Sequence, residues 1–281
     1  MAAELLYGKP IVDAIIEQLQ THPEPVGLGV IQVGDLPEST RYVNQLKKTA
    51  LRLPQLAVQH ISMEQSATAQ QLKSVMTACN ENVDMAGYML LLPLPLKLQE
   101  RLQEVRGWIA AEKDIDLLGY AQRGIFLSGK REHQLLPPTP YAVMKMLKHY
   151  GCDVRGKVIV IVGDGLVGSM LKIMVGNDKG TQIVCNDETP DFASLVRQGD
   201  MVIGAAGKPD IITGNMIKKD AVVVNVGLKV LGGKLFGDVH PESVIPQASM
   251  FTPIEGGLGS VTVGALIWNA FKASRWQRME K

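Results

Sequence analysis

Residues 157–168 read KVIVIVGDGLVG, and this stretch decides the fold of the chain around it. Residues 158–162 are consecutive β-branched aliphatics, a pattern typical of a strand that is buried on both faces of a parallel sheet. Gly163, Gly165 and Gly168 follow in the spacing G-x-G-x-x-G, and residues 166–175 continue as an apolar run of helical length. A strand, a tight glycine turn and a helix in this order predict a dinucleotide-binding unit.

Each glycine of this turn has a separate expected task. The first permits the turn, the second lets the backbone approach a pyrophosphate, and the third lets the helix pack against the strand. The free N–H groups and the dipole of the helix then favour phosphate charge. The expected cofactor contacts in this stretch are Gly163, Asp164, Gly165, Val167 and Gly168. The alternative is a glycine turn in an α/β protein without a nucleotide, and a carboxylate at Asp164 facing a pyrophosphate would weaken binding.

An acidic pair lies where dinucleotide-binding folds hold the adenosine ribose. Residues 182–185 predict a short strand, and Asp187 and Glu188 follow it. An acid about 20 residues after the turn accepts hydrogen bonds from the ribose 2′-OH, and it repels a 2′-phosphate. The spacing therefore favours NAD over NADP.

Composition limits the class of protein. The 281 residues suffice for two domains of roughly 100–150 residues each. A net charge of +1 gives no electrostatic case for binding nucleic acid or an acidic membrane surface. Cys79, Cys152 and Cys185 are scattered, which predicts neither a disulfide framework nor a metal site and suits a reducing cytosol. No signal peptide and no run of 18 apolar residues is visible, so we expect a cytoplasmic protein.

Strands and helices are predicted to alternate along the chain, which favours parallel sheets with helices on both faces. Ser39 is expected to cap one helix, and Thr139 with Pro140 to open another that reaches about Tyr150. The other expected helices and strands are helices at 11–19, 40–53, 68–80 and 260–272, and strands at 27–33, 56–61, 87–92, 201–205 and 221–226. A glycine-rich loop is expected at 251–259.

Eight short motifs occur in a fixed order between about residues 4 and 270. They are SxxYVxxxxK at 39–48, LPLP at 92–95, KDxD at 113–116, PPTP at 137–140, GKP at 207–209, VGL at 226–228, GDV at 237–239 and TPxxGGxGxxTV at 252–263. In order and spacing the chain resembles the bifunctional methylenetetrahydrofolate dehydrogenase/methenyltetrahydrofolate cyclohydrolase family.

The resemblance implies an α/β protein of two domains with a cleft between them. A folate-type substrate domain would span 1–140 and be rejoined by the C-terminal helix 262–281, and a Rossmann NAD(P)-binding domain would span 141–261. It further implies a tetrahydrofolate derivative as substrate and a homodimer.

The family's site residues carry over to matching positions of this chain. Tyr42, which would stack on the folate, and Asp116, which would hold the pterin, are the candidate catalytic residues. The remaining candidates are Pro253, Glu255, Gly256 and Gly257 for the substrate, and Gly207 and Leu228 for the cofactor. Without the motifs, Tyr42 could be an ordinary half-buried tyrosine and Asp116 a turn former.

Two departures from the family pattern affect its chemistry. The lysine of the family's Y-V-x-x-K motif is Leu46 here, and its glutamine partner before LPLP is Leu91. Hydride transfer from the methylene carbon is driven by a neighbouring nitrogen lone pair and depends mainly on orientation. Hydrolysis of the methenyl cation needs an activated water, a task worth roughly 10²–10⁴-fold from a positioned group. Lys47 lies about 100° further round the helix and should point away.

Three functions therefore remain open at the level of sequence. The first is an NAD-dependent dehydrogenase acting on methylenetetrahydrofolate or a related folate, with weak or absent cyclohydrolase activity. The second is a catalytically silent family member that binds a ligand or partner. The third is a dehydrogenase for another substrate. Glu255 and Ser260, which replace two prolines of the family's loop, leave the ligand open as well.

Overall fold

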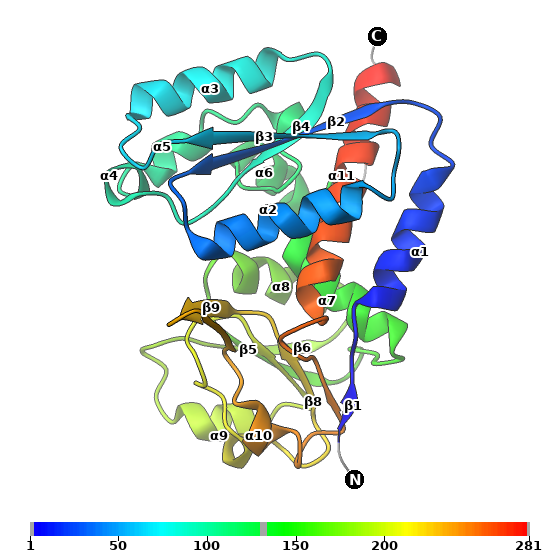
Figure 1. Ribbon diagram of the computed structural model, residues 1–281. Coiled ribbons are helices and arrows are strands. Elements are labelled where there is room, and N and C mark those ends of the chain that lie inside the picture. Colours follow the sequence, from blue (N-terminus) through cyan, green and yellow to red (C-terminus); the bar gives the residue numbers. More distant parts are fainter. Residues whose placement is uncertain (1–2, 130–133, 280–281) are drawn as a thin grey trace. The chain divides into compact units, whose positions relative to one another are not determined.

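The computed structural model describes residues 3–129 and 134–279, which divide into two compact units. One unit combines residues 1–13 with 139–262, and the other combines 14–138 with 263–281. The boundaries fall inside α1 (Lys9–Gln20), at the start of α7 (Pro138–His149) and inside α11 (Leu258–Met279) (Figure 1). The expected domain division instead placed residues 1–13 in the folate-type domain. Residues 280–281 of the expected C-terminal helix lie outside the described residues.

The unit that contains the glycine turn is built on a six-stranded parallel sheet. Its strands, in spatial order, are β1 (Glu4–Leu5), β11 (Met250–Phe251), β8 (Val222–Asn225), β7 (Met201–Gly204), β5 (Val158–Val162) and β6 (Thr181–Cys185). Because β1 pairs with β11 at the edge of this sheet, the first residues of the chain belong to this unit. Residues 159–162 of β5 are buried, which confirms the prediction of a strand covered on both faces.

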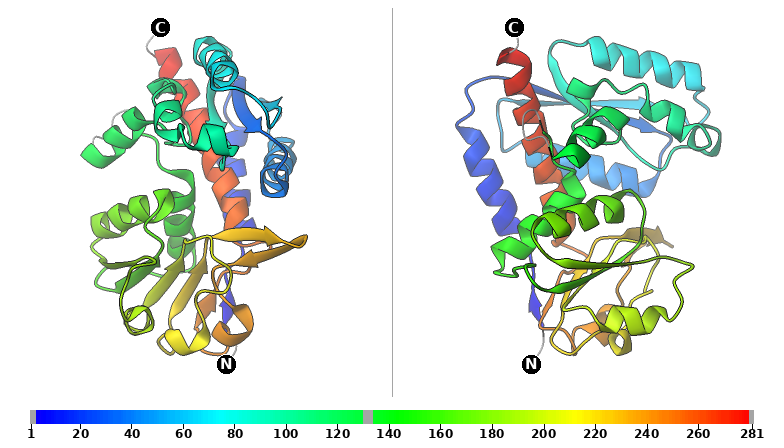
Figure 2. Two further views of the ribbon diagram at one scale, coloured as in Figure 1. Left: turned by 90° about the vertical axis from the view of Figure 1, so that its left-hand side faces the viewer. Right: turned by 180° about the vertical axis from the view of Figure 1, so that it is seen from behind.

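Two helices cover the strands that flank the turn. Helix α8 (Leu166–Asn177) and helix α9 (Phe192–Arg197) both pack against β5 and β6. Short elements follow at η2 (Gly214–Met216) and α10 (Pro241–Val244). A separate antiparallel hairpin is formed by β9 (Leu228–Leu231) and β10 (Lys234–Gly237) (Figure 2). Its turn contains Gly232 and Gly233, which both have positive φ. The sequence carried this signal, since a Gly-Gly pair between apolar runs favours a two-residue hairpin.

The second unit is organised around a three-stranded parallel sheet in the order β3-β2-β4. The strands are β2 (Val26–Val33), β3 (Leu56–Met63) and β4 (Met85–Leu90). Helices α2 (Pro37–Ala50) and α3 (Ala69–Glu81) lie on opposite faces of this sheet (Figure 1). The chain then forms α4 (Leu96–Gln99), α5 (Leu102–Arg106), η1 (Ala111–Lys113) and α6 (Tyr120–Ser128).

The expected helix starts need correction at two places. Helix α2 begins at Pro37, and no side chain caps it, so Ser39 is a buried residue of the first turn and not the cap. Proline fixes its own φ near the helical value and lacks the N–H that would be unpaired there, so it opens the helix earlier. Helix α7 likewise begins at Pro138, which places Thr139 inside the helix. Helix α11 extends further than the expected 260–272 at both ends.

Two further findings concern the described residues. No helix in the described ranges is both long enough and apolar enough to cross a membrane. The three cysteines are free, and no group of three or more His, Cys, Asp or Glu side chains in those ranges is arranged to hold a metal ion.

Candidate functional site

The glycine turn after β5 is packed so closely that two of its glycines cannot be replaced. A Cβ atom on Gly163, whose φ is 113°, would lie 2.4 Å from the carbonyl oxygen of Ala205. A Cβ atom on Gly168 would lie 1.9 Å from the carbonyl oxygen of Gly163. At Gly165, by contrast, no atom lies within 4 Å of the added Cβ position. Gly163 and Gly168 therefore shape the turn, while Gly165 leaves open space in front of it.

The helix that follows the turn presents donors to this open space. Helix α8 has Gly165 at its N-cap, and this residue makes no side-chain cap hydrogen bond to the N–H groups of the first turn. The first N–H groups of a helix have no intrahelical acceptors, and together with the helix dipole they favour an anion. Open space at Gly165 and uncapped N–H groups fit the pyrophosphate of a dinucleotide.

A pocket of about 440 Å³ lies at the carboxyl ends of β5, β6 and β7. It brings together four of the predicted cofactor residues, namely Gly163, Asp164, Gly165 and Asp187, with Glu188 beside them. The other four predicted residues do not line it; they are Val167, Gly168, Gly207 and Leu228. Phe192, Ile211 and Lys208 line the pocket as well, and none of them was predicted as a cofactor contact.

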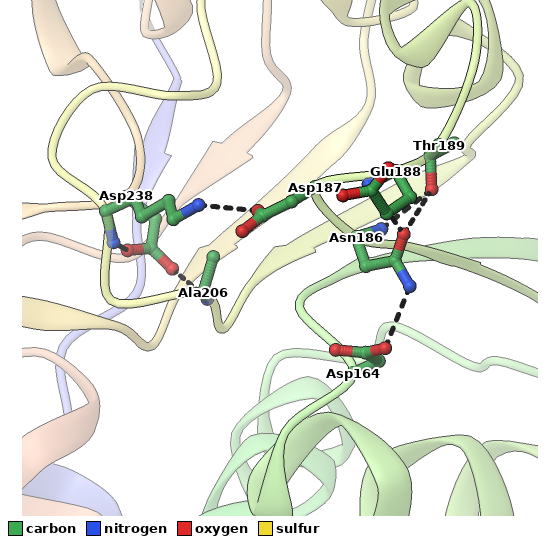
Figure 3. A network of polar contacts seen from close by, with 8 residues as sticks. Asp164, Asn186, Asp187, Glu188, Thr189, Ala206 and Asp238 are labelled. Carbon is green, nitrogen blue, oxygen red and sulfur yellow. Dashed lines mark hydrogen bonds and ion pairs between the residues drawn. The ribbon is translucent and has the colours of Figure 1, made fainter.

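Asp164 does not point freely into the pocket. Its carboxylate accepts a hydrogen bond of 2.9 Å from the side-chain amide of Asn186, which lies in the loop after β6 (Figure 3). The amide oxygen of Asn186 in turn accepts bonds of 3.1 Å from the Glu188 N–H and the Thr189 hydroxyl. The Asp164 carboxylate is thus hydrogen-bonded to the loop after β6, which leaves it less free to face a pyrophosphate at the glycine turn.

Asp187 is paired with a cation that the sequence analysis missed. The Lys208 ammonium lies 2.5 Å from a carboxylate oxygen of Asp187, and both side chains are more than half exposed. Lys208 belongs to the loop after β7, whereas Asp187 belongs to the loop after β6. Because β5 lies between these two strands, the ion pair links the loops on either side of the glycine turn.

A buried carboxylate fixes the loop that carries Lys208. The side chain of Asp238 is 1% exposed and accepts hydrogen bonds from the backbone N–H groups of Ala206, at 2.5 Å, and Lys208, at 2.7 Å. Burial raises the pKa of Asp238, and the N–H groups of the loop oppose that rise. Gly227 packs so closely on Asp238 that a Cβ there would lie 2.2 Å from the carboxylate. The signal for this role was the GDV motif, which the sequence analysis quoted without a function.

The substrate candidates Tyr42 and Asp116 lie close enough in the other unit to influence each other. Burial and the Asp116 carboxylate raise the pKa of the Tyr42 phenol. Burial and the neighbouring Asp114 raise the pKa of Asp116 to about 8. Asp114 itself is 1% exposed, accepts bonds from the N–H groups of Leu118 and Gly119, and has a pKa raised by burial to about 6. Asp116 is therefore largely protonated at neutral pH, while Asp114 serves the turn.

The two leucines at the positions where the family pattern predicts a polar pair are core residues. Leu46 is 0% exposed on α2, and Leu91, directly after β4, is 7% exposed. Lys47 is exposed, and its ammonium lies 3.4 Å from the Nδ1 atom of His60 on β3. The expectation that Lys47 points away from the position of Leu46 is consistent with this arrangement.

The remaining substrate candidates form a tight loop ahead of α11. Gly256 has a φ of 73°, and its carbonyl accepts a bond of 2.8 Å from the Gly8 N–H. A Cβ on Gly257 would lie 2.1 Å from the carbonyl oxygen of Pro253. The exposed Glu255 lies in this loop. A substrate contact by these residues remains a prediction.

Sequence comparison assigns both halves of the chain to one family. A family model described as tetrahydrofolate dehydrogenase/cyclohydrolase, catalytic domain, matches residues 6–116. A second, described as its NAD(P)-binding domain, matches residues 137–278. The bifunctional protein FolD of Acetivibrio thermocellus is 33% identical over 290 residues, which cover 100% of both chains. That of Wolinella succinogenes is 36% identical over 89% of this chain and 86% of its own.

Solved structures of similar proteins share the fold. A bifunctional FolD enzyme from Campylobacter jejuni has a TM-score of 0.88 at 31% identity, covering 98% of this chain and 99% of that one. The Trypanosoma brucei methylenetetrahydrofolate dehydrogenase-cyclohydrolase, solved in complex with NADP cofactor and an inhibitor, has a TM-score of 0.90 at 28% identity and covers 98% of both chains.

Proposed function

The chain belongs to the tetrahydrofolate dehydrogenase/cyclohydrolase family, and from that premise we propose that it oxidises 5,10-methylenetetrahydrofolate to 5,10-methenyltetrahydrofolate with NAD. We further propose that its cyclohydrolase activity is weak or lost. The observation that carries the second part is the burial of Leu46 and Leu91 at the two polar positions.

The proposed cofactor site is the pocket at the glycine turn. When bound, the nicotinamide would accept the hydride, and the chain would supply binding and orientation. The N–H groups at the start of α8 would bind the pyrophosphate in the space that Gly165 leaves open. Asp187 would accept a hydrogen bond from the adenosine ribose, and its negative charge supports NAD over NADP.

The proposed substrate contacts on the folate side are Tyr42 and Asp116. A tyrosine ring stacks on the flat pterin or benzoyl group, and a carboxylate accepts bonds from pterin N–H donors. With a pKa of about 8, Asp116 would give up its proton when the pterin binds. These residues orient the substrate for hydride transfer, a step that needs no additional acid or base from the chain.

The hydrolytic step fails in this proposal for lack of a polar group. A leucine can neither activate water nor carry a proton, and both leucines are buried. Lys47 is held near His60 on the surface side of α2 and does not supply the missing amine. We also infer, from the family resemblance alone, that the protein is a cytoplasmic homodimer.

Calorimetric titration with NAD, NADP and tetrahydrofolate derivatives tests the proposal. It predicts binding of NAD that is tighter than binding of NADP, and binding of a reduced folate. Equal or tighter binding of NADP would overturn the cofactor assignment. Binding of folate without either dinucleotide would favour the catalytically silent alternative, and binding of NAD without folate would favour another substrate.

A further inference from the structure

We propose that Lys208 determines how the pocket discriminates between NAD and NADP, an inference that rests on the proposed dinucleotide site. In this view the ion pair of Lys208 with Asp187, and not Asp187 alone, sets the preference. Lys208 orients the carboxylate toward the ribose, and it is the cation that a 2′-phosphate would recruit.

The first argument is position. The Lys208 ammonium lies 2.5 Å from Asp187, so it is within reach of whatever the ribose 2′ position carries if Asp187 binds that ribose. The backbone of Lys208 is fixed by the buried carboxylate of Asp238, so the start of this side chain is held in place before any ligand binds. A phosphate at the 2′ position would therefore meet both Asp187 and Lys208.

The second argument is charge. Asp164, Asp187 and Glu188 line the pocket, and Lys208 is the one basic side chain that lines it among the residues the structure describes. A phosphate monoester adds a charge of about −1.5 to −2 at pH 7, so the three acids oppose it. Charge-assisted contacts from a lysine to a phosphate are stronger than neutral hydrogen bonds, and Lys208 is placed to supply one.

The third argument is how easily the lysine can change partners. Lys208 and Asp187 are 51% and 67% exposed, and exposed ion pairs contribute little to stability. Lys208 can therefore leave Asp187 for a phosphate with little loss, but Asp187 is then left unpaired beside that phosphate. With NAD, the ion pair between Lys208 and Asp187 stays intact while a carboxylate oxygen of Asp187 accepts a hydrogen bond from the 2′-OH. The preference for NAD follows from the difference between these two arrangements.

A double-mutant cycle tests the inference. The proteins are the unmodified chain, Asp187→Ser, Lys208→Met and the double variant, and the readout is the calorimetric dissociation constant for NAD and for NADP at one fixed ionic strength. We expect Asp187→Ser to tighten NADP binding about tenfold or more, and we expect that gain to vanish when Lys208→Met is added. Lys208→Met alone should weaken NADP binding more than NAD binding, because only NADP carries the 2′-phosphate that the ammonium would contact.

Controls separate this role from general effects. Lys219→Met removes an exposed lysine that lines a different pocket of the same unit and should change neither constant. If Lys208→Met weakens NAD and NADP equally, Lys208 contacts a phosphate common to both and the inference is overturned. The inference is also overturned if the double variant binds NADP as tightly as Asp187→Ser does. If the unmodified chain binds neither dinucleotide, the proposed function fails together with the inference.

Discussion

Restoring the family's lysine by Leu46→Lys should destabilise the protein strongly, because Leu46 has no exposed surface. A buried lysine gives up its proton or forces its way to solvent. Taking a proton from an amine of pKa about 10.4 at pH 7 costs about 4.6 kcal/mol, at about 1.36 kcal/mol per unit. The alkyl stem of lysine retains part of the apolar burial. We therefore expect the free energy of unfolding to fall by about 3–5 kcal/mol at pH 7.

Urea unfolding followed by tryptophan fluorescence measures this loss. All three tryptophans, Trp108, Trp268 and Trp276, lie in the same unit as Leu46. Burial depresses the pKa of the new amine, so the folded state binds the proton less tightly and the loss should shrink by about 1.4 kcal/mol per pH unit above pH 7. Leu46→Met, which keeps size and polarity, should cost less than about 1.5 kcal/mol.

The family pattern places the lysine's glutamine partner at the position of Leu91, so we expect Leu91→Gln to supply a hydrogen-bond acceptor to the restored lysine. The double variant should be more stable than the sum of the single changes predicts, and hydrolysis of methenyltetrahydrofolate should rise above the spontaneous rate only in it. A loss below about 1 kcal/mol for Leu46→Lys, unchanged between pH 7 and 9, would refute the reasoning, because the amine would then reach water without constraint.

Three further predictions follow from the same structure. Gly165→Ala should abolish NAD binding but leave the melting temperature unchanged, because no atom lies near the added Cβ. Gly168→Ala should lower both the melting temperature and the affinity for NAD, because its Cβ would meet the backbone of Gly163. Equal losses of stability in the two variants would contradict this. Folate affinity should weaken about tenfold per pH unit below pH 8 as Asp116 takes up its proton. Asp116→Asn should remove this pH dependence. A folate affinity of the unmodified protein that does not change with pH would contradict the prediction. Asp238→Asn should lower the free energy of unfolding by about 1–3 kcal/mol and weaken NAD binding. The two carboxylate oxygens of Asp238 each accept a hydrogen bond from a loop N–H group, whereas an asparagine side chain has only one acceptor oxygen. An unchanged free energy of unfolding in urea would argue against this role.

The sequence predicted the parts of the fold that depend on neighbouring residues. Strand β5 and the start of α8 lie where the pattern of 157–168 placed them, because burial and glycine spacing are local properties. The prediction that Ser39 caps α2 was wrong, because the helix already begins at Pro37. This helix start also depends on a local property, because proline is favoured at the first position of a helix, and Pro37 therefore predicts it from the sequence.

The polar partners of the candidate site were beyond such reasoning. Asp238 is 30 residues from Lys208, and the Lys208 contact with Asp187 exists only because β7 and β6 flank β5. Strand order depends on long-range packing, so Lys208 could not be assigned to Asp187 from the sequence. The same limit applies to residues 1–13, whose strand β1 joins a sheet formed mostly by residues after 157.

The fate of the methenyl product tests the central claim most directly. The purified protein is mixed with methylenetetrahydrofolate and NAD, and the formation and decay of methenyltetrahydrofolate are followed by its absorbance together with that of NADH. With Leu46 and Leu91 in place, we expect NADH and methenyltetrahydrofolate to form in equal amounts and the methenyl compound to decay only at its spontaneous rate. Enzyme-dependent decay of added methenyltetrahydrofolate, or the absence of NADH formation, would contradict the account.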